Sequence, residues 1–205
     1  PYCVCNGEMV EITSPVWERK HNWLPSFRFE NESFLLEGVI FSPPGERGFF
    51  YSLTLSNKKT ERLEVSLGLE GSIHGLNHIM NEARCMRVAK EVKSSNWNHS
   101  VVFSFVGETD ILSLAPIFDK DRETIVEKIS ENGSDIAYCF YKEQSLSAGE
   151  KISFDGIWGL GYEEVSASTS AKELLRHGLE WEYGQTVRRL EQLCDSRRKK
   201  QVLPE

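Results

Sequence analysis

The stretch FFYSLTLS, residues 49–56, places an apolar side chain at every second position: Phe49, Tyr51, Leu53 and Leu55. The stretch LEVSLGLE, residues 63–70, repeats this pattern. A period of two residues is typical of a β-strand that buries one face. Because only a short polar link, residues 57–60, lies between the two strands, we expect them to form an antiparallel hairpin.

Apolar stretches of similar length recur as far as residue 157, and turn-forming residues such as those at 43–46 and 147–150 separate them. This spacing is typical of a large antiparallel β-sandwich, so we predict a mainly β fold. Residues 14–31 show no sustained period and are expected to form a loop. Further strands are predicted at residues 8–13, 34–41, 84–92, 101–106, 110–117, 124–129, 136–141 and 151–157.

The apolar period changes after Thr169, where apolar residues begin to recur every three or four positions. This spacing predicts an amphipathic helix that begins after the possible N-caps at 168–170 and is interrupted at Gly178. Its apolar stripe must be buried, either on the sandwich or on a neighbouring domain. We therefore expect a β-sandwich domain at 1–165 and a helical linker toward a further, C-terminal domain at 166–205. The stripe consists of Leu175, Leu179, Tyr183, Val187, Leu190 and Cys194.

The charge and the apolar runs of the chain argue against two classes of partner, nucleic acids and membranes. The 205 residues carry a net charge of −7, which argues against nucleic acid as a partner. The one basic run, 197–200, follows the helix and complements the negative end of its dipole. No apolar run is long enough to cross a membrane, so no membrane partner is expected.

The cysteine pattern indicates the compartment. Five scattered cysteines do not form a disulfide framework, which favours a reducing, cytoplasmic location. Cys3 and Cys5 are expected to point to opposite faces of a strand. Cys85 and Cys139 are interpreted as small core residues. Whether a targeting signal precedes Pro1 is left open.

Motifs for chemistry are sparse. The sequence has no nucleophile elbow, P-loop or dinucleotide fingerprint, so no cofactor is predicted. His74 and His78 have the spacing of two metal ligands, but Gly75 stands where a zinc protease has glutamate, and no metal is predicted. Gly159 and Gly161 are interpreted as a turn. No pair of acidic residues stands out, so we expect no catalytic residue in the chain itself.

Tryptophans are the remaining signal. Sugar rings stack on aromatic rings, and their hydroxyls bond charged or amide groups. The alternative is that these tryptophans anchor the core or an interface, since tryptophan is highly buried on average. We favour a core or interface role for Trp158 and Trp181. For Trp17, Trp23 and Trp97, which lie in predicted loops, both roles stay open. The candidates for carbohydrate contact are Trp17, Glu18, Arg19, His21, Trp23 and Trp97.

Three segments carry a family resemblance. Residues 45–57, GERGFFYSLTLSN, followed by 63–70, resemble an early hairpin of N-terminal "supersandwich" domains. Such domains precede the six-hairpin α/α barrel of bacterial glycoside hydrolases and phosphorylases. Residues 146–154 are similar to their closing strand, and residues 170–178 resemble the linker helix that leads into the barrel.

The resemblance implies a non-catalytic N-terminal domain of a carbohydrate-active enzyme, a glycosidase or glycoside phosphorylase. In such enzymes the catalytic acid and base lie on the barrel, and the sandwich packs on it and helps to shape the substrate cleft. The partners would be the C-terminal α/α-barrel domain of the same polypeptide and an oligosaccharide substrate. The stripe residues from Leu175 to Leu190 would then pack between the domains. Two alternatives stay open: a stand-alone carbohydrate-binding or adhesive sandwich, and an enzyme in its own right.

Overall fold

A computed structural model describes residues 1–21, 23–74, 91–97, 100–106, 110–118, 125–132 and 135–201. The part of residues 84–92 that precedes β8 lies outside these ranges, as do Cys85 and His78. The elements are β1 (Tyr2–Cys5), β2 (Glu8–Met9), β3 (Val16–Lys20), β4 (Leu24–Glu30), β5 (Phe34–Phe41), β6 (Gly48–Asn57), β7 (Leu63–Ile73), β8 (Glu91–Trp97), β9 (Ser100–Val106), β10 (Asp110–Phe118), β11 (Ile125–Asn132), β12 (Asp135–Leu146), β13 (Lys151–Gly161), α1 (Glu164–His177) and α2 (Leu179–Gln201).

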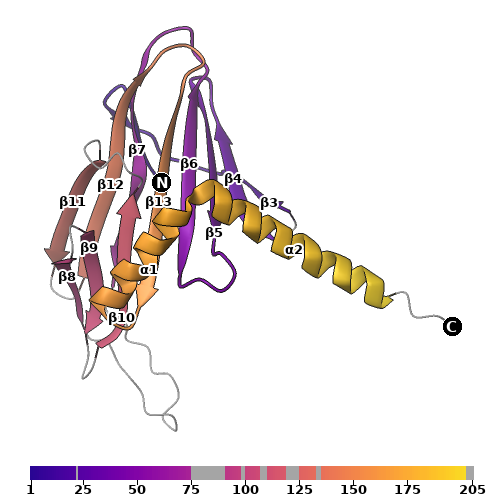
Figure 1. The fold of residues 1–205 in the computed structure, drawn as a ribbon. Coiled ribbons are helices and arrows are strands. Elements are labelled where there is room, and N and C mark those ends of the chain that lie inside the picture. Colours follow the sequence, from indigo (N-terminus) through magenta and orange to yellow (C-terminus); the bar gives the residue numbers. More distant parts are fainter. Residues whose placement is uncertain are drawn as a thin grey trace.

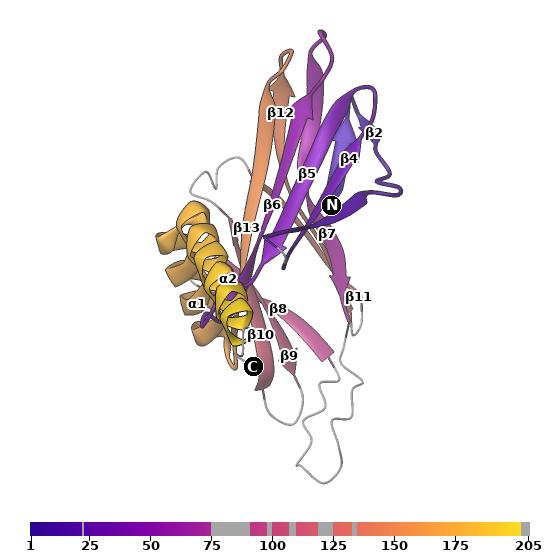
Figure 2. The same ribbon diagram turned by 90° about the vertical axis from the view of Figure 1, so that its right-hand side faces the viewer.

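Two antiparallel sheets form a sandwich, which confirms the predicted mainly β fold (Figures 1 and 2). One sheet has the order β11-β12-β7-β1-β2 and the other β3-β4-β5-β6-β13-β10-β9-β8. Their facing sides supply the main core, with residues such as Leu55, Phe103 and Phe154 from the larger sheet and Leu67 and Phe140 from the smaller. These side chains are buried because apolar surface is removed from water on both sheets at once.

The two helices form a third layer over one end of the outer face of the eight-stranded sheet (Figure 2). Helix α1 packs on β10 and β13 through Ala167 and Ala171, which are fully buried. Gly159 and Gly161 lie in β13 and not in the predicted turn. A methyl group on either would overlap the backbone of α1, so both glycines allow the helix to lie close to the strand.

The predicted hairpin of residues 49–56 and 63–70 is wrong, although both segments are strands. Strand β6 pairs with β5 and β13, whereas β7 pairs with β1 and β12 in the other sheet. The link between β6 and β7 therefore crosses the sandwich. Buried Asn57 holds this crossing: its Nδ2 donates to the carbonyl oxygens of Glu61 at 2.8 Å and Leu146 at 3.1 Å.

Two predicted loops are strands. Within the predicted loop, Val16–Lys20 forms β3 and Leu24–Glu30 forms β4 at one edge of the larger sheet, and Trp97 lies in β8 at the opposite edge. The apolar period of β3 is hidden because all five of its residues are exposed. Propensity alone therefore could not separate this edge strand from a loop.

The helical segment starts earlier than predicted. Helix α1 begins at Glu164, with Glu163 as N-cap, and the Glu163 backbone N–H donates to Ser166 Oγ at 3.2 Å. Ser168, one of the predicted caps, is buried inside the helix. The predicted interruption at Gly178 is confirmed: α1 ends there, and the positive φ of 87° suits glycine.

We expect Gly159→Ala to lower the free energy of unfolding by about 2–3 kcal/mol, because the added methyl group must push α1 away from β13. Gly184→Ala is the matched control. Nothing lies within 4 Å of the methyl group at this helical position, so this substitution should raise the free energy of unfolding by about 1 kcal/mol. Urea unfolding of both variants measures the difference. Equal effects would contradict the close packing of α1 on β13.

Candidate functional site

The candidate carbohydrate residues on β3 face opposite sides of the sheet. Trp17 pairs with Phe27 and shares its face, which looks toward the five-stranded sheet, and their rings are 5.4 Å apart. Glu18 pairs with Ser26 and faces the helical side with it. Arg19 shares the face of Trp17 because side chains alternate along a strand.

The other three candidates lie elsewhere. His21 faces α2, where its Nδ1 is 3.9 Å from Glu191 Oε1 and its ring is 6.0 Å from that of Tyr183. Trp23 is exposed in the turn before β4, and Trp97 lies at the far edge of the same sheet. The structure therefore does not bring the six candidates together into one site, and their contact with carbohydrate stays a prediction.

The apolar stripe of the helices lies on the sandwich itself. Its residues are partly buried against a small cluster formed by Leu24, Phe41, Phe50, Ile157 and Leu174. Tyr183 is in edge contact with Phe41, with ring centroids 5.5 Å apart. The residues that make this contact are Leu175, Leu179, Tyr183, Val187 and Leu190. Trp158 is buried in the core, as expected, whereas Trp181 is largely exposed.

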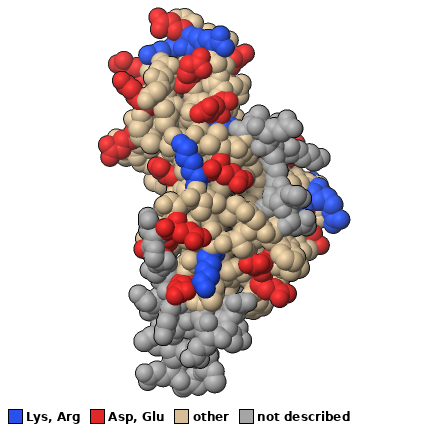
Figure 3. Space-filling model, turned by 90° about the vertical axis from the view of Figure 1, so that its left-hand side faces the viewer, with Lys and Arg blue, Asp and Glu red and all other residues tan. Residues whose placement is uncertain are grey.

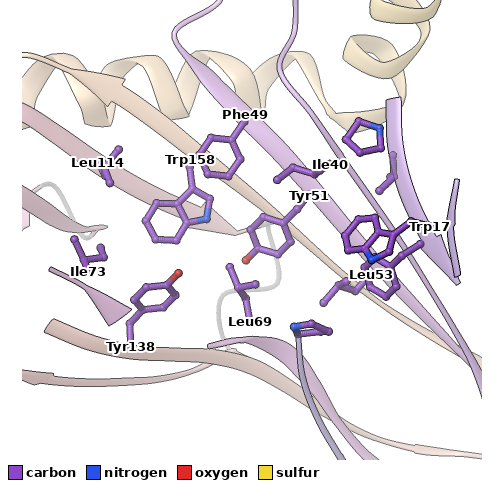
Figure 4. A pocket seen from close by; sticks show the side chains of 14 residues that line it. Trp17, Ile40, Phe49, Tyr51, Leu53, Leu69, Ile73, Leu114, Tyr138 and Trp158 are labelled. Carbon is purple, nitrogen blue, oxygen red and sulfur yellow. The ribbon is translucent and has the colours of Figure 1, made fainter. Parts of the chain in front are cut away.

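A pocket of about 330 Å³ lies between the two sheets (Figure 4). Its mouth is marked by Trp17, which is 64% exposed, and Ile40, and its deep end by Tyr51, Leu53 and Trp158, which are buried. Only uncharged side chains line it. They are Pro1, Trp17, Pro25, Phe27, Val39, Ile40, Phe49, Tyr51, Leu53, Leu69, Ile73, Leu114, Tyr138 and Trp158.

Glycines opposite aromatic residues make room for this pocket. Phe27 pairs with Gly38, Tyr51 with Gly156, and Tyr138 with Gly71. In each pair, a methyl group on the glycine would come within 3 Å of the aromatic side chain, so the ring lies across the glycine of the neighbouring strand. Rings that lie along their own sheets leave the space between the sheets unfilled.

Polar atoms are few in the pocket and lie at its deep end. The side chains of Tyr51, Tyr138 and Trp158 turn their polar atoms toward the central space (Figure 4). Tyr51 Oη and Trp158 Nε1 are buried, and neither has a partner at hydrogen-bond geometry among the described residues. Burial raises the pKa of Tyr51 well above its ordinary value, and Tyr138 adds to this; the nearby Trp158 indole acts in the opposite direction.

Sequence reasoning missed this pocket. Its lining comes from strands of both sheets, and the glycine–aromatic pairs depend on register between strands that are distant in sequence. Of the six predicted site residues, Trp17 alone lines it. The one signal in the sequence was the set of glycines within strand patterns, which marks places where another group approaches closely.

Among the described residues, the side of the sandwich near β11 shows no gathering of one kind of charge (Figure 3). Acidic and basic side chains are interspersed on the side of β11 and β12, with no large basic area among the residues drawn in colour (Figure 3). Within the described ranges, no three or more His, Cys, Asp or Glu side chains gather as they would around a metal. His74 instead contacts Asp135, with Nδ1 3.0 Å from Oδ2.

Two further expectations concern location and cysteines. No helix among the described residues is long and apolar enough to cross a membrane.

Cys3 and Cys5 do not face opposite sides of β1: their sulfurs are 3.9 Å apart, because residues two apart in a strand share a face. Cys3 is buried and Cys139 half-buried.

This chain is similar to known proteins in its fold and not in its sequence. No protein-family model and no curated protein matches the sequence. Among solved structures, a protein described as a kojibiose phosphorylase from the human microbiome matches 93% of this chain with a TM-score of 0.57 and 10% identity. A polysaccharide lyase matches 84% of it with a TM-score of 0.52 and 11% identity.

These likenesses define the fold class. The chain spans about a quarter, 27%, of the length of each of the two structures. At such low identity they establish the fold alone. The expected resemblance to a sandwich domain found within larger carbohydrate-active enzymes is thereby confirmed at the level of fold.

Tyr51 provides a test of the pocket's deep end. The raised pKa of Tyr51 means that the folded state holds this proton more tightly than the unfolded state. The contribution of Tyr51 to the free energy of unfolding is therefore fully present below about pH 10 and is lost as the pH rises further. The loss approaches about 1.4 kcal/mol per pH unit for one such group. We expect Tyr51→Phe to reduce this alkaline loss in urea unfolding between pH 9 and pH 11.

Tyr162→Phe is the matched control, because Tyr162 is 67% exposed and its substitution should leave the alkaline slope unchanged. The same slope in wild type and Tyr51→Phe would show that Tyr51 ionises freely, contrary to its buried position.

Proposed function

We propose that this chain is the non-catalytic N-terminal β-sandwich domain of a glycoside hydrolase or phosphorylase. One observation carries the proposal. The fold matches nearly the whole of this chain but only 27% of a kojibiose phosphorylase and of a polysaccharide lyase. A unit of this size within two enzymes of different reactions is better explained as a shared accessory domain than as the site of chemistry.

The chemistry of the pocket supports a non-catalytic role. Cleavage of a glycosidic bond by the usual route needs two carboxyl groups on opposite sides of the bond. The pocket between the sheets has no Asp or Glu among the described residues that line it. The catalytic acid and base would therefore belong to the α/α-barrel domain that we expect to follow residues 166–205.

Helix α2 is the proposed contact with that barrel. The helix extends beyond the edge of the sandwich (Figure 1). The stripe that is half-buried on the sheet continues along the helix to Leu193, which is 49% exposed. We infer that Leu193 lies against the barrel, while Leu175, Leu179 and Tyr183 fix the helix to the sandwich. The sandwich would then hold the barrel and help to shape the rim of its oligosaccharide cleft.

Leu193→Glu tests this contact in two settings. In the chain of 205 residues the free energy of unfolding should change by less than about 0.5 kcal/mol, as for most exposed positions. In the longer enzyme we expect a loss of about 1–3 kcal/mol, because the carboxylate would be buried at the domain contact. Thermal and urea unfolding of both proteins measure these changes.

Met9→Glu is the matched control, since Met9 is exposed to a similar extent, 58%, but lies on β2 away from the helices. It should be neutral in both proteins. The interface is refuted if Leu193→Glu is as neutral as Met9→Glu in the longer enzyme.

A titration of the isolated chain with oligosaccharides separates the two classes of function. A non-catalytic accessory domain should show no saturable binding by calorimetry and no hydrolysis of aryl glycosides. Saturable binding that Trp17→Ala or Trp97→Ala weakens would favour the stand-alone carbohydrate-binding module instead.

A further inference from the structure

We propose that the pocket between the sheets binds a small, uncharged, largely apolar molecule that carries one hydrogen-bond acceptor. This inference does not depend on the proposed function, because it concerns the interior of the sandwich and not the helical contact. A flat aromatic ketone or ester has the required chemistry.

The pocket is built by the sequence and is not a chance gap in packing. Protein interiors are close-packed, and a space of about 330 Å³ between two sheets leaves many side chains without contacts on one side. Three glycine–aromatic pairs, from three different strand pairings, open this space together. Its volume is within the range of small-molecule sites, about 300–1,000 Å³.

A ligand has a route into the pocket. Trp17 and Ile40 at the mouth are exposed, and β3 is an edge strand, paired on one side only. The aromatic ring of Trp17 lies beside Phe27 and can stack on a flat molecule as it enters. The walls then lead to Trp158 at the deep end (Figure 4).

Two buried donors determine the polar part of the ligand. Indole Nε1–H can only donate, and the Tyr51 hydroxyl proton also needs an acceptor. Both groups are buried, and neither meets strict hydrogen-bond geometry with a partner among the described residues, although the Trp158 indole lies near enough to the Tyr51 hydroxyl to lower its pKa. A buried unsatisfied polar group is costly, so a ligand oxygen placed between Tyr51 and Trp158 would gain two donors.

The same inventory argues against sugars and ions. A sugar ring carries several hydroxyls, each of which is costly to bury without a partner, and this pocket offers few polar atoms. An ionised ligand would meet no side chain of opposite charge in the described lining, where the amino group of Pro1 is the one charged group. The predicted ligand class is therefore distinct from the carbohydrate substrate of the proposed enzyme.

The test uses 6-propionyl-2-dimethylaminonaphthalene, an uncharged, flat fluorophore with one carbonyl acceptor. Its emission shifts to the blue in an apolar site. We expect the 205-residue chain to bind it saturably at one site, with a blue shift and with energy transfer from tryptophan. No saturable binding to the folded wild-type chain would overturn the proposal.

Pocket variants locate the binding. Leu69→Phe and Leu114→Phe add side-chain volume to the pocket from opposite sheets, and each should reduce the affinity for the fluorophore tenfold or more. Two such variants are used so that the test still stands if one of them fails to fold. Tyr51→Phe keeps the shape and removes one donor, so it should weaken binding about fivefold. Val165→Phe and Tyr162→Phe, at exposed positions outside the pocket, should not change it.

The affinities of the pocket variants, compared with those of the control variants, show whether the fluorophore binds between the sheets. Weaker binding in the pocket variants alone supports the inference. Binding that is equal in all folded variants, or reduced equally by the controls, would mean adsorption to the surface and would overturn it. Neither outcome depends on whether the chain belongs to a carbohydrate-active enzyme.

Discussion

The eight-stranded sheet carries buried apolar residues on both of its faces, and the rest of the structure depends on this constraint. Leu53, Phe103 and Phe154 face the smaller sheet, whereas Phe50 and Ile157 face the helices. Each face needs its own apolar cover, since an exposed face of this size would leave a large apolar patch in water. The five-stranded sheet covers one face, and α1 with the first half of α2 covers the other. The helical segment is therefore part of the sandwich's packing.

The same constraint explains the position of the glycines. On the outer face, Gly159 and Gly161 let α1 approach β13 closely, so that small residues such as Ala167 and Ala171 suffice to fill the contact. Toward the inner face, glycines opposite Tyr51 and Tyr138 let large rings lie along the sheets. Glycine thus produces tight packing on one side of the larger sheet and an open pocket on the other.

Strands with a strong period could be predicted from sequence, as residues 49–56 and 63–70 illustrate. Their pairing could not, because both bury apolar residues toward one core whether they are neighbours or lie in facing sheets. The sequence predicts loops at Trp17 and Trp97 because short edge strands with exposed, charged residues lack a clear period. The spacing of the stripe from Leu175 to Leu190 predicts that it is buried but does not distinguish the sandwich from a neighbouring domain as its cover. Its contact with Phe41 and Phe50 required the structure.

Helix α1 belongs to the sandwich, whereas the far end of α2 is the part that we propose to contact a following domain. Amide hydrogen exchange of the 205-residue chain, read by mass spectrometry, tests this arrangement most directly. Amides of α1 should exchange as slowly as those of β6 and β13, since all three open only by global unfolding, and those near Leu193 should exchange much faster. Fast exchange throughout α1 beside a protected sheet would contradict the claim, because the helix would then be only a linker.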